Sequence, residues 1–384
     1  MIEAKDFVEA ARELGFIRYT GVPCSFLTPF INYVINDNSL EYISSSNEGD
    51  ALATTSGSVI GGQRSIVMMQ NSGLGNAVSP ITSLSYVFKI PFLIIVTHRG
   101  KPGVKDEPQH ELMGKITKDL FEIMKIPSEI FPNEREKIIP ALERAEKYMS
   151  KEQRPYAFIM NKETVAPEEL NSQMLNDITK RKNVIHSFFS EEKMSLDRNT
   201  VLRHIIKQTD KDKTILIATT GYTGRELFSI EDRDNHIYMV GSMGCASSFG
   251  LGLALARPDL KIIIIDGDGA ALMRMGNFPT IGTYAGKNLI HILLDNEVHD
   301  STGAQSTVSK NIDFSIIAKA CGYNTIFSGN KIELIDELFS VEDNEGAIFG
   351  HLKICSGTIK NLPRPNIKPD QVLRRMMRHI NTSL

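Results

Sequence analysis

The chain has 384 residues, 41% of them hydrophobic and 23% charged, which suits two well-packed domains and argues against disorder. A formal net charge of −3 argues against a partner that is a nucleic acid or an anionic membrane. The N-terminal segment is charged from Glu3 onward, so it does not resemble a signal peptide, and no apolar run is long enough to span a membrane. Four cysteines without metal-ligand spacing are typical of free thiols in a cytoplasmic protein.

Strand and helix patterns alternate through the first half of the chain. The expected helices cover residues 4–15, 27–35 and 51–60, with one more after residue 76 and two before residue 155. The expected strands cover residues 16–21, 40–44, 65–69, 91–97 and 155–160. Residues 98–112 form a polar, basic loop that is too long for a simple connector. This alternation predicts a parallel, doubly wound sheet.

The alternation lapses between residues 162 and 199 and then resumes. We therefore predict a first domain over residues 1–180, a linker over 181–199 that can hold a short helix or hairpin, and a second domain over 200–384. The second domain's expected strands cover residues 214–218, 237–240, 262–265, 289–294, 325–327 and 346–353, and its last helix residues 371–380. The predicted fold class is α/β, with two doubly wound parallel-sheet domains.

One β-α-β unit of the second domain carries a distinctive pattern. The apolar run Ile262–Ile265 is typical of a strand buried on both faces, and it ends in Asp266-Gly267-Asp268-Gly269. A helical pattern follows, with Leu272, Met275 and Phe278 on one side, and then a second apolar run that ends in Asp295-Asn296. Ligands of open α/β sheets bind at the carboxyl ends of the strands, where these polar residues lie.

The polar residues of this unit predict a site for a metal ion and a phosphate. Asp268 and Asn296 offer a carboxylate and an amide oxygen, which suit a hard ion such as Mg²⁺. Gly267 and Gly269 let the backbone approach a phosphate, and the following helix directs its N–H groups toward it. A glycine-rich turn in an ordinary Rossmann-like sheet is the alternative.

This unit resembles the GDG…NN diphosphate-binding motif of thiamine-diphosphate enzymes, with Asp295 in place of the first Asn. The resemblance implies thiamine diphosphate and Mg²⁺ as cofactors, with Asp268, Asn296 and the Val298 carbonyl as metal ligands. It also implies that Met243 wedges between the cofactor rings and that the Gly241 carbonyl accepts from the 4′-amino group. Further candidate cofactor contacts are Gly267, Gly269, Ala270, Thr219, Thr220 and Gly221. The last three can equally be a plain helix cap.

Glu48 stands where a strand meets a helix, the place at which these enzymes carry a single catalytic Glu. In the family, this carboxyl group contacts the aminopyrimidine N1′ and favours the imino tautomer, so that the ylid forms at the thiazolium carbon. The alternative is an exposed Glu favoured by the helix macrodipole.

Four stretches, residues 21–26, 70–77, 103–114 and 295–305, resemble the phosphonopyruvate decarboxylase family over nearly the whole chain. The resemblance implies a lyase of phosphonate biosynthesis that converts phosphonopyruvate to phosphonoacetaldehyde and CO₂ through the ylid and an enamine. The sulfopyruvate decarboxylases share the layout, but residues 106–110 and 299–303 favour the former. An acetolactate-type carboligase usually has a central domain, which is absent here, and a non-catalytic cofactor-binding protein does not need Glu48.

The basic loop is predicted to bind the anionic tail of the substrate. Arg99, Lys101 and Lys105 are candidate partners of the phosphonate, and a solvated loop with incidental charge is the alternative. Ser25 and Asn71 are candidates to hydrogen-bond the carboxylate without neutralising it.

Two histidines, His110 and His299, are candidate donors of the proton that the enamine needs. In the family, the pyrimidine and the diphosphate bind to domains of different subunits. The resemblance therefore implies a homodimer at minimum, with the active site at the subunit interface.

Overall fold

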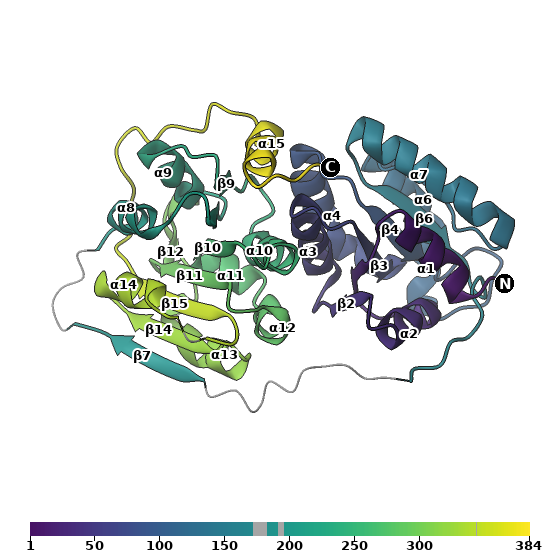
Figure 1. Ribbon diagram of the computed structural model, residues 1–384, viewed down its shortest axis with the longest axis horizontal. Coiled ribbons are helices and arrows are strands. Elements are labelled where there is room, and N and C mark those ends of the chain that lie inside the picture. The colour runs from purple at the N-terminus through teal and green to yellow at the C-terminus, as the bar shows by residue number, and fades with distance from the viewer. Residues whose placement is uncertain (172–182, 191–195, 343) are drawn as a thin grey trace. The chain divides into compact units, whose positions relative to one another are not determined.

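The computed structural model describes residues 1–171, 183–190, 196–342 and 344–384. The chain separates into two compact units with the boundary between residues 175 and 176. Each unit is built around one parallel sheet with helices on both faces, so the predicted fold class is confirmed (Figure 1).

The sheet of the first unit has the order β2-β1-β3-β4-β6-β5, and all of its pairings are parallel. Its strands are β1 (Arg18–Gly21), β2 (Glu41–Ser44), β3 (Ser65–Gln70), β4 (Leu93–Thr97), β5 (Ser128–Ile130) and β6 (Tyr156–Met160). We did not expect β5. It is a three-residue edge strand without an apolar run, so the sequence gives no periodic signal for it.

Helices cover both faces of this sheet. They are α1 (Ala4–Glu13), α2 (Thr28–Asn36), α3 (Glu48–Ile60), α4 (Leu74–Pro80), α5 (Tyr86–Phe88), α6 (Glu111–Ile123) and α7 (Ile138–Glu152). Helices α1, α2 and α7 share one core with β3, β4 and β6, where Phe7 packs edge-on against Phe30 and Phe158. The expected basic loop is shorter than predicted, because Pro108–His110 form a 3₁₀ turn and α6 begins at Glu111.

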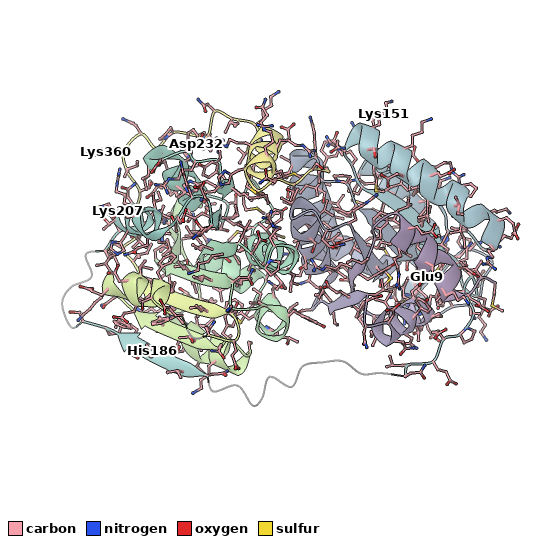
Figure 2. The ribbon with its side chains drawn as sticks, in the orientation of Figure 1. Glu9, Lys151, His186, Lys207, Asp232 and Lys360 are labelled. Atoms are coloured by element: carbon pink, nitrogen blue, oxygen red, sulfur yellow. The ribbon has the colours of Figure 1, made fainter. Side chains whose placement is uncertain are left out.

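The sheet of the second unit has the order β7-β14-β15-β11-β10-β8-β9, again with parallel pairings. Its strands are β7 (Val184–Phe188), β8 (Thr214–Ala218), β9 (His236–Tyr238), β10 (Lys261–Gly267), β11 (Leu289–Asp295), β14 (Thr325–Gly329) and β15 (Ile348–Lys353). Strand β7, which carries His186 (labelled in Figure 2), falls within the expected linker, yet it pairs with β14. The His186 ring stacks on that of Phe327 with centroids 5.0 Å apart.

The helices of this unit are α8 (Arg198–Gln208), α9 (Tyr222–Ile230), α10 (Cys245–Ala256), α11 (Asp268–Met273), α12 (Asn277–Tyr284), α13 (Phe314–Ala320), α14 (Glu333–Phe339) and α15 (Pro369–His379). The single helix expected after the GDG motif is in fact two, α11 and α12. The break lies at Arg274, whose φ of −132° and ψ of 42° are not helical. A two-stranded hairpin, β12 (Val298–His299) and β13 (Gln305–Ser306), follows β11. Within the described ranges, no helix is both long and apolar enough to cross a bilayer.

Candidate active site

A cavity of about 290 Å³ lies at the C-terminal ends of β8, β10 and β11 in the second unit. The predicted cofactor and metal residues that line it are Thr219, Thr220, Gly221, Met243, Gly267, Asp268, Gly269, Ala270, Asn296 and Val298. His299 lines it too. Gly241 does not, but its N–H donates to the Thr220 hydroxyl at 3.2 Å. These residues are distributed over eighty positions of sequence, and the parallel sheet brings them to one edge.

Two glycines of this cavity have conformations or contacts that a larger residue would not allow. A Cβ on Gly269 would lie 2.3 Å from Cε1 of His299 and 3.2 Å from Cε of Met243. Gly221 has a φ of +98° and is the N-cap of α9, where no side chain makes a capping hydrogen bond. The threonines before it therefore do not act as a plain cap of α9.

Asp268 and Asn296 are held by hydrogen bonds to neighbouring residues, among them one from the Val298 N–H to Oδ1 of Asn296 at 3.4 Å. Asp268 is buried as the first residue of α11, and its Oδ2 accepts a hydrogen bond from the Thr307 hydroxyl. Burial raises the pKa of the Asp268 carboxyl group, and the Thr307 hydrogen bond opposes this rise. Nδ2 of Asn296 donates to Asp300 at 2.6 Å, which leaves the amide oxygen directed away from Asp300.

The donor set fits a magnesium diphosphate. A carboxylate, an amide oxygen and a backbone carbonyl are hard ligands, and Mg²⁺ fills its other positions with phosphate oxygens and water. Across the part of the chain that the structure describes, no group of three His, Cys, Asp or Glu residues is arranged to hold a metal. A buried carboxylate such as Asp268 is costly without a nearby cation, so the site favours a bound divalent ion.

Arg198, for which no site role is predicted from the sequence, also lines this cavity. Its guanidinium donates to Asp300 at 2.8 Å and to Glu226 at 3.0 Å, and all three side chains are buried. Arg198 is thus connected through Asp300 to Asn296, a predicted metal ligand. It lies within the expected linker and about a hundred residues from Asp300, so no local pattern joins the two. The only sequence signal for this network is that Asp300 closely follows the Asp295-Asn296 motif.

Asp295, the departure from the family motif, is fully buried at the end of β11. Burial alone would raise its pKa, but hydrogen bonds from His351 and Lys353 outweigh burial and lower the pKa to about 2. The site therefore holds a carboxylate here, with its cationic partner supplied by β15.

Glu48 is the first residue of α3 and is buried, which excludes the alternative of an exposed helix-start Glu. Its carboxylate accepts from Nδ2 of Asn76 at 2.8 Å. A Cβ on Gly73 would lie 2.1 Å from Oε1 of Glu48, so the segment after β3 packs directly on this carboxyl group. Asn47 caps α3 by accepting from the Asp50 N–H at 3.1 Å. No individual role is predicted for Asn76 or Gly73 from the sequence.

Arg99 and Ser25, both predicted to hold substrate, are brought together, but Arg99 is not a free cation. Its Nε donates to Asp106 at 2.8 Å, a second nitrogen donates to the same carboxylate at 2.5 Å, and a third donates to Ser25 at 3.2 Å. The guanidinium also lies over the Phe26 ring at 4.8 Å. The hydrogen bond to Asp106 raises the pKa of Arg99, and the same bond holds the pKa of Asp106 well below its usual range. Lys101 is half-buried and Lys105 is exposed.

The Asn71 side chain is fully buried, and its Nδ2 donates to the Arg99 carbonyl at 2.8 Å and to the Thr117 hydroxyl at 3.0 Å. These two bonds brace the basic loop against α6 and occupy both N–H groups that the expected contact with the substrate carboxylate would use. Oδ1 has no hydrogen-bond partner among the described residues.

His110 is buried at the end of the 3₁₀ turn. Its Nδ1 has no hydrogen-bond partner among the described residues. A Cβ on Gly100 would lie 1.9 Å from the His110 carbonyl oxygen, so the loop packs tightly on this turn. His110 and His299 belong to different units, and the second is the one that lines the cavity.

Both halves of the chain match sequence patterns of thiamine pyrophosphate enzymes; thiamine pyrophosphate is another name for thiamine diphosphate. Residues 3–123 match the N-terminal TPP binding domain, and residues 220–348 match the C-terminal TPP binding domain. These two matches contain Glu48 and the GDG motif respectively.

Curated relatives extend the likeness over the full length. The phosphonopyruvate decarboxylase of Streptomyces viridochromogenes is 38% identical over 100% of this chain and 96% of that protein. The phosphonopyruvate decarboxylase of Streptomyces hygroscopicus is 38% identical over 98% of this chain and 93% of that protein. The sulfopyruvate decarboxylase of Methanosarcina acetivorans is 28% identical over 96% of this chain and 95% of that protein.

A solved structure shows the same fold at low identity. Benzoylformate decarboxylase from Polynucleobacter necessarius superposes with a TM-score of 0.70 and 13% identity, covering 92% of this chain and 99% of that one. With its two matched domains and its full-length curated relatives, the chain belongs to the thiamine pyrophosphate enzymes and, within them, to the family of the phosphonopyruvate decarboxylases.

Proposed function

We propose that this chain converts phosphonopyruvate to phosphonoacetaldehyde and CO₂, with thiamine diphosphate and Mg²⁺ as cofactors. One observation carries the proposal. The residues that a magnesium diphosphate needs converge in one cavity of a chain that aligns end to end with phosphonopyruvate decarboxylases.

The chain's own residues would hold and activate the cofactor. Asp268, Asn296 and the Val298 carbonyl bind the metal, and the backbone around Gly267 and Gly269 binds the diphosphate. When bound, thiamine diphosphate supplies a nucleophilic carbon and an electron sink for the decarboxylation. Glu48 would hold a proton at Oε1 for the pyrimidine N1′, while Asn76 donates to Oε2.

The substrate's tail would be read in the first unit. Arg99 is oriented by Asp106 and Phe26, and it offers a rigid planar cation next to the Ser25 hydroxyl. Lys101 and Lys105 add positive charge on the same loop. The carboxylate must leave as CO₂, so a hydroxyl such as that of Ser25 suits it better than a cation does.

A proton has to reach the carbon from which CO₂ departs. We assign this role to His299, whose imidazole packs on Gly269 at the wall of the cavity. His110 is the second candidate, and its buried Nδ1 needs a partner that the described residues do not supply.

We also infer a homodimer in which Glu48 of one copy and Asp268 of another serve the same cofactor. Size-exclusion chromatography with light scattering tests the dimer. Mixing Glu48→Gln and Asp268→Ala proteins, each inactive alone, tests the sharing, because a mixed dimer would contain one intact site. Activity that does not return after subunit exchange would contradict the shared site. The free thiols of Cys24, Cys245, Cys321 and Cys355 support a cytoplasmic location.

The decisive experiment measures CO₂ release from phosphonopyruvate, sulfopyruvate and pyruvate, with and without thiamine diphosphate and Mg²⁺. We expect cofactor-dependent release that is fastest with phosphonopyruvate. Faster release from sulfopyruvate would reassign the substrate, and release accompanied by carbon–carbon bond formation would indicate a carboligase. Cofactor binding without release from any of them would indicate a non-catalytic binding protein.

A further inference from the structure

The backbone turn that presents the metal ligands has an unusual conformation. It spans Asp295, Asn296, Glu297 and Val298, between β11 and the hairpin that follows. Glu297 has a φ of +62°, in the left-handed region that non-glycine residues rarely adopt. Such a conformation persists only where surrounding contacts over-determine it, so the contacts of this turn show what keeps Asn296 and the Val298 carbonyl in place.

Asp295 accepts four hydrogen bonds. Oδ1 accepts from the Glu297 N–H at 3.1 Å and from the Ser309 hydroxyl at 2.9 Å. Oδ2 accepts from Nε2 of His351 at 2.9 Å and lies 2.8 Å from Nζ of Lys353. An Asn has a single acceptor oxygen and an NH₂ group that only donates. It could therefore accept on one side only, and its NH₂ group would face either the Glu297 N–H or the Lys353 ammonium, neither of which accepts. Donors on both sides require the carboxylate that distinguishes this chain from the usual motif.

Lys353 contacts the turn on both sides of Asn296. It is the last residue of β15 and is paired in register with Asp295 across the parallel sheet. Its Nζ lies 2.8 Å from Asp295 and donates to Oε1 of Glu297 at 2.9 Å. One ammonium group therefore bridges the residue before Asn296 and the left-handed residue after it.

The same network reaches the other metal ligand. The Ser309 hydroxyl, which donates to Asp295, lies 3.0 Å from the Thr307 hydroxyl, and Thr307 donates to Asp268. The Thr307 N–H also donates to the Glu297 carbonyl at 2.8 Å. A displacement of the Asp295 turn would thus also move Asn296 and Asp268.

We propose that Lys353 is a positioning residue for the metal site. Acting through the Asp295 carboxylate and Glu297, it holds the left-handed turn that carries the Asn296 amide oxygen and the Val298 carbonyl, the two groups that would bind Mg²⁺. The Asp295–Lys353 pair replaces the Asn found at the first position of the related motif. The inference rests on the cofactor assignment of the proposed function and is independent of which 2-oxo acid is the substrate.

The test compares Lys353→Met, Lys353→Arg, Asp295→Asn and the double variant Asp295→Asn/Lys353→Met in the full chain. Calorimetric titration with Mg²⁺ at saturating thiamine diphosphate measures metal affinity without turnover. Contacts that orient metal ligands typically contribute about ten- to a hundredfold to metal affinity, so we expect Lys353→Met to weaken Mg²⁺ binding by that factor. Lys353→Arg should keep most of the affinity, because it keeps the charge.

The double variant separates charge compensation from simple damage. Removing one partner of a buried ion pair leaves an uncompensated charge, whereas removing both often costs little. We therefore expect Asp295→Asn/Lys353→Met to bind Mg²⁺ more tightly than Lys353→Met does. The matched control is Arg375→Met, which breaks a half-buried ion pair with Asp232 (Figure 2) in the same unit and should leave Mg²⁺ affinity unchanged.

Two results would overturn the proposal: wild-type Mg²⁺ affinity in Lys353→Met, or a double variant no tighter than the single one. If Lys353→Met does not fold, the test relies on the double variant. The proposal then requires that the double variant folds and binds Mg²⁺. A protein that binds the cofactor with these variant effects but does not decarboxylate phosphonopyruvate would refute the proposed substrate and leave this inference intact.

Discussion

Both units place charged residues at one edge of their sheet, but they neutralise these charges in different ways. In the second unit, the predicted ligands converge on one cavity, and residues remote in sequence, Arg198 and Lys353, neutralise the carboxylates around it. In the first unit, the basic loop pairs its most rigid cation, Arg99, with Asp106 only seven residues away.

The difference shows that a sequence motif predicts the position of a charged group more reliably than it predicts whether a neighbouring residue already neutralises that charge. The predicted metal ligands of the second unit, Asp268 and Asn296, follow their strands directly, so the sheet sets their positions. The cations of the first unit lie on a loop, where an acidic neighbour decides which of them is already paired. Each prediction below tests one side of this contrast.

The largest effect should come from Asp268→Ala. Without this carboxylate, the site loses the only anionic ligand in the predicted set, and we expect Mg²⁺-dependent retention of thiamine diphosphate to become undetectable by calorimetry. Asp259→Ala, next to the opposite end of β10, is the control and should bind normally. Retained binding in Asp268→Ala would mean that the metal lies elsewhere.

Glu48→Gln should leave the fold and most of the cofactor affinity, because the amide oxygen can still accept from Asn76. Turnover should fall by about two to four orders of magnitude, the usual contribution of a positioned acid–base group. The measurement is the exchange rate of the C2 proton of bound thiamine diphosphate, with Glu41→Gln at the start of β2 as control. An unchanged exchange rate would remove Glu48 from catalysis.

Arg99→Gln should lower kcat/KM for phosphonopyruvate by about one to two orders of magnitude, the value of one lost charge-assisted contact. Pyruvate, which has no tail, should lose much less. Lys101→Gln and Lys105→Gln should have smaller effects, since Lys105 is exposed and Lys101 is half-buried. Equal losses on both substrates would mean that the loop supports structure and that the tail is read elsewhere.

The smallest effect should be on acid stability. The folded-state pKa of Asp295 is about 2, below its unfolded value of ~3.9. Its contribution is therefore present above about pH 4 and is lost as the pH falls toward 2, amounting to about 2 kcal/mol of unfolding free energy. Urea unfolding at stepped pH should show a flatter acid profile for Asp295→Asn than for wild type.

The first unit supplies a comparison for this measurement. Hydrogen bonds from Arg12 lower the pKa of Asp37 to about 2 as well, but both side chains are about a third exposed. Solvent screens the exposed pair, so Asp37→Asn should change the pH dependence of the unfolding free energy less than Asp295→Asn does. The opposite order would show that burial is not what gives the Asp295 pair its strength.

The sequence by itself determined the fold class, most of the strands and the edge at which the cofactor residues lie. Buried parallel strands read as apolar runs, and polar residues that directly follow such runs must meet at one edge. The positions of Asp268 and Asn296 could be predicted for this reason, whereas Glu48 was predicted from the family resemblance. Strand β5 could not, because it is short and half-exposed, and neither could the helix break at Arg274.

The tertiary structure alone decided which groups neutralise, brace or bury those residues. Strand β7 lies in a stretch with no periodic signal, and only its pairing with β14 makes it part of the second sheet. Asn71 proved to be a brace, and Arg99 proved to be paired. Arg198 and Lys353 reach the site from more than fifty residues away. Such contacts depend on the register of parallel strands and on side-chain reach, which no local pattern of residues encodes.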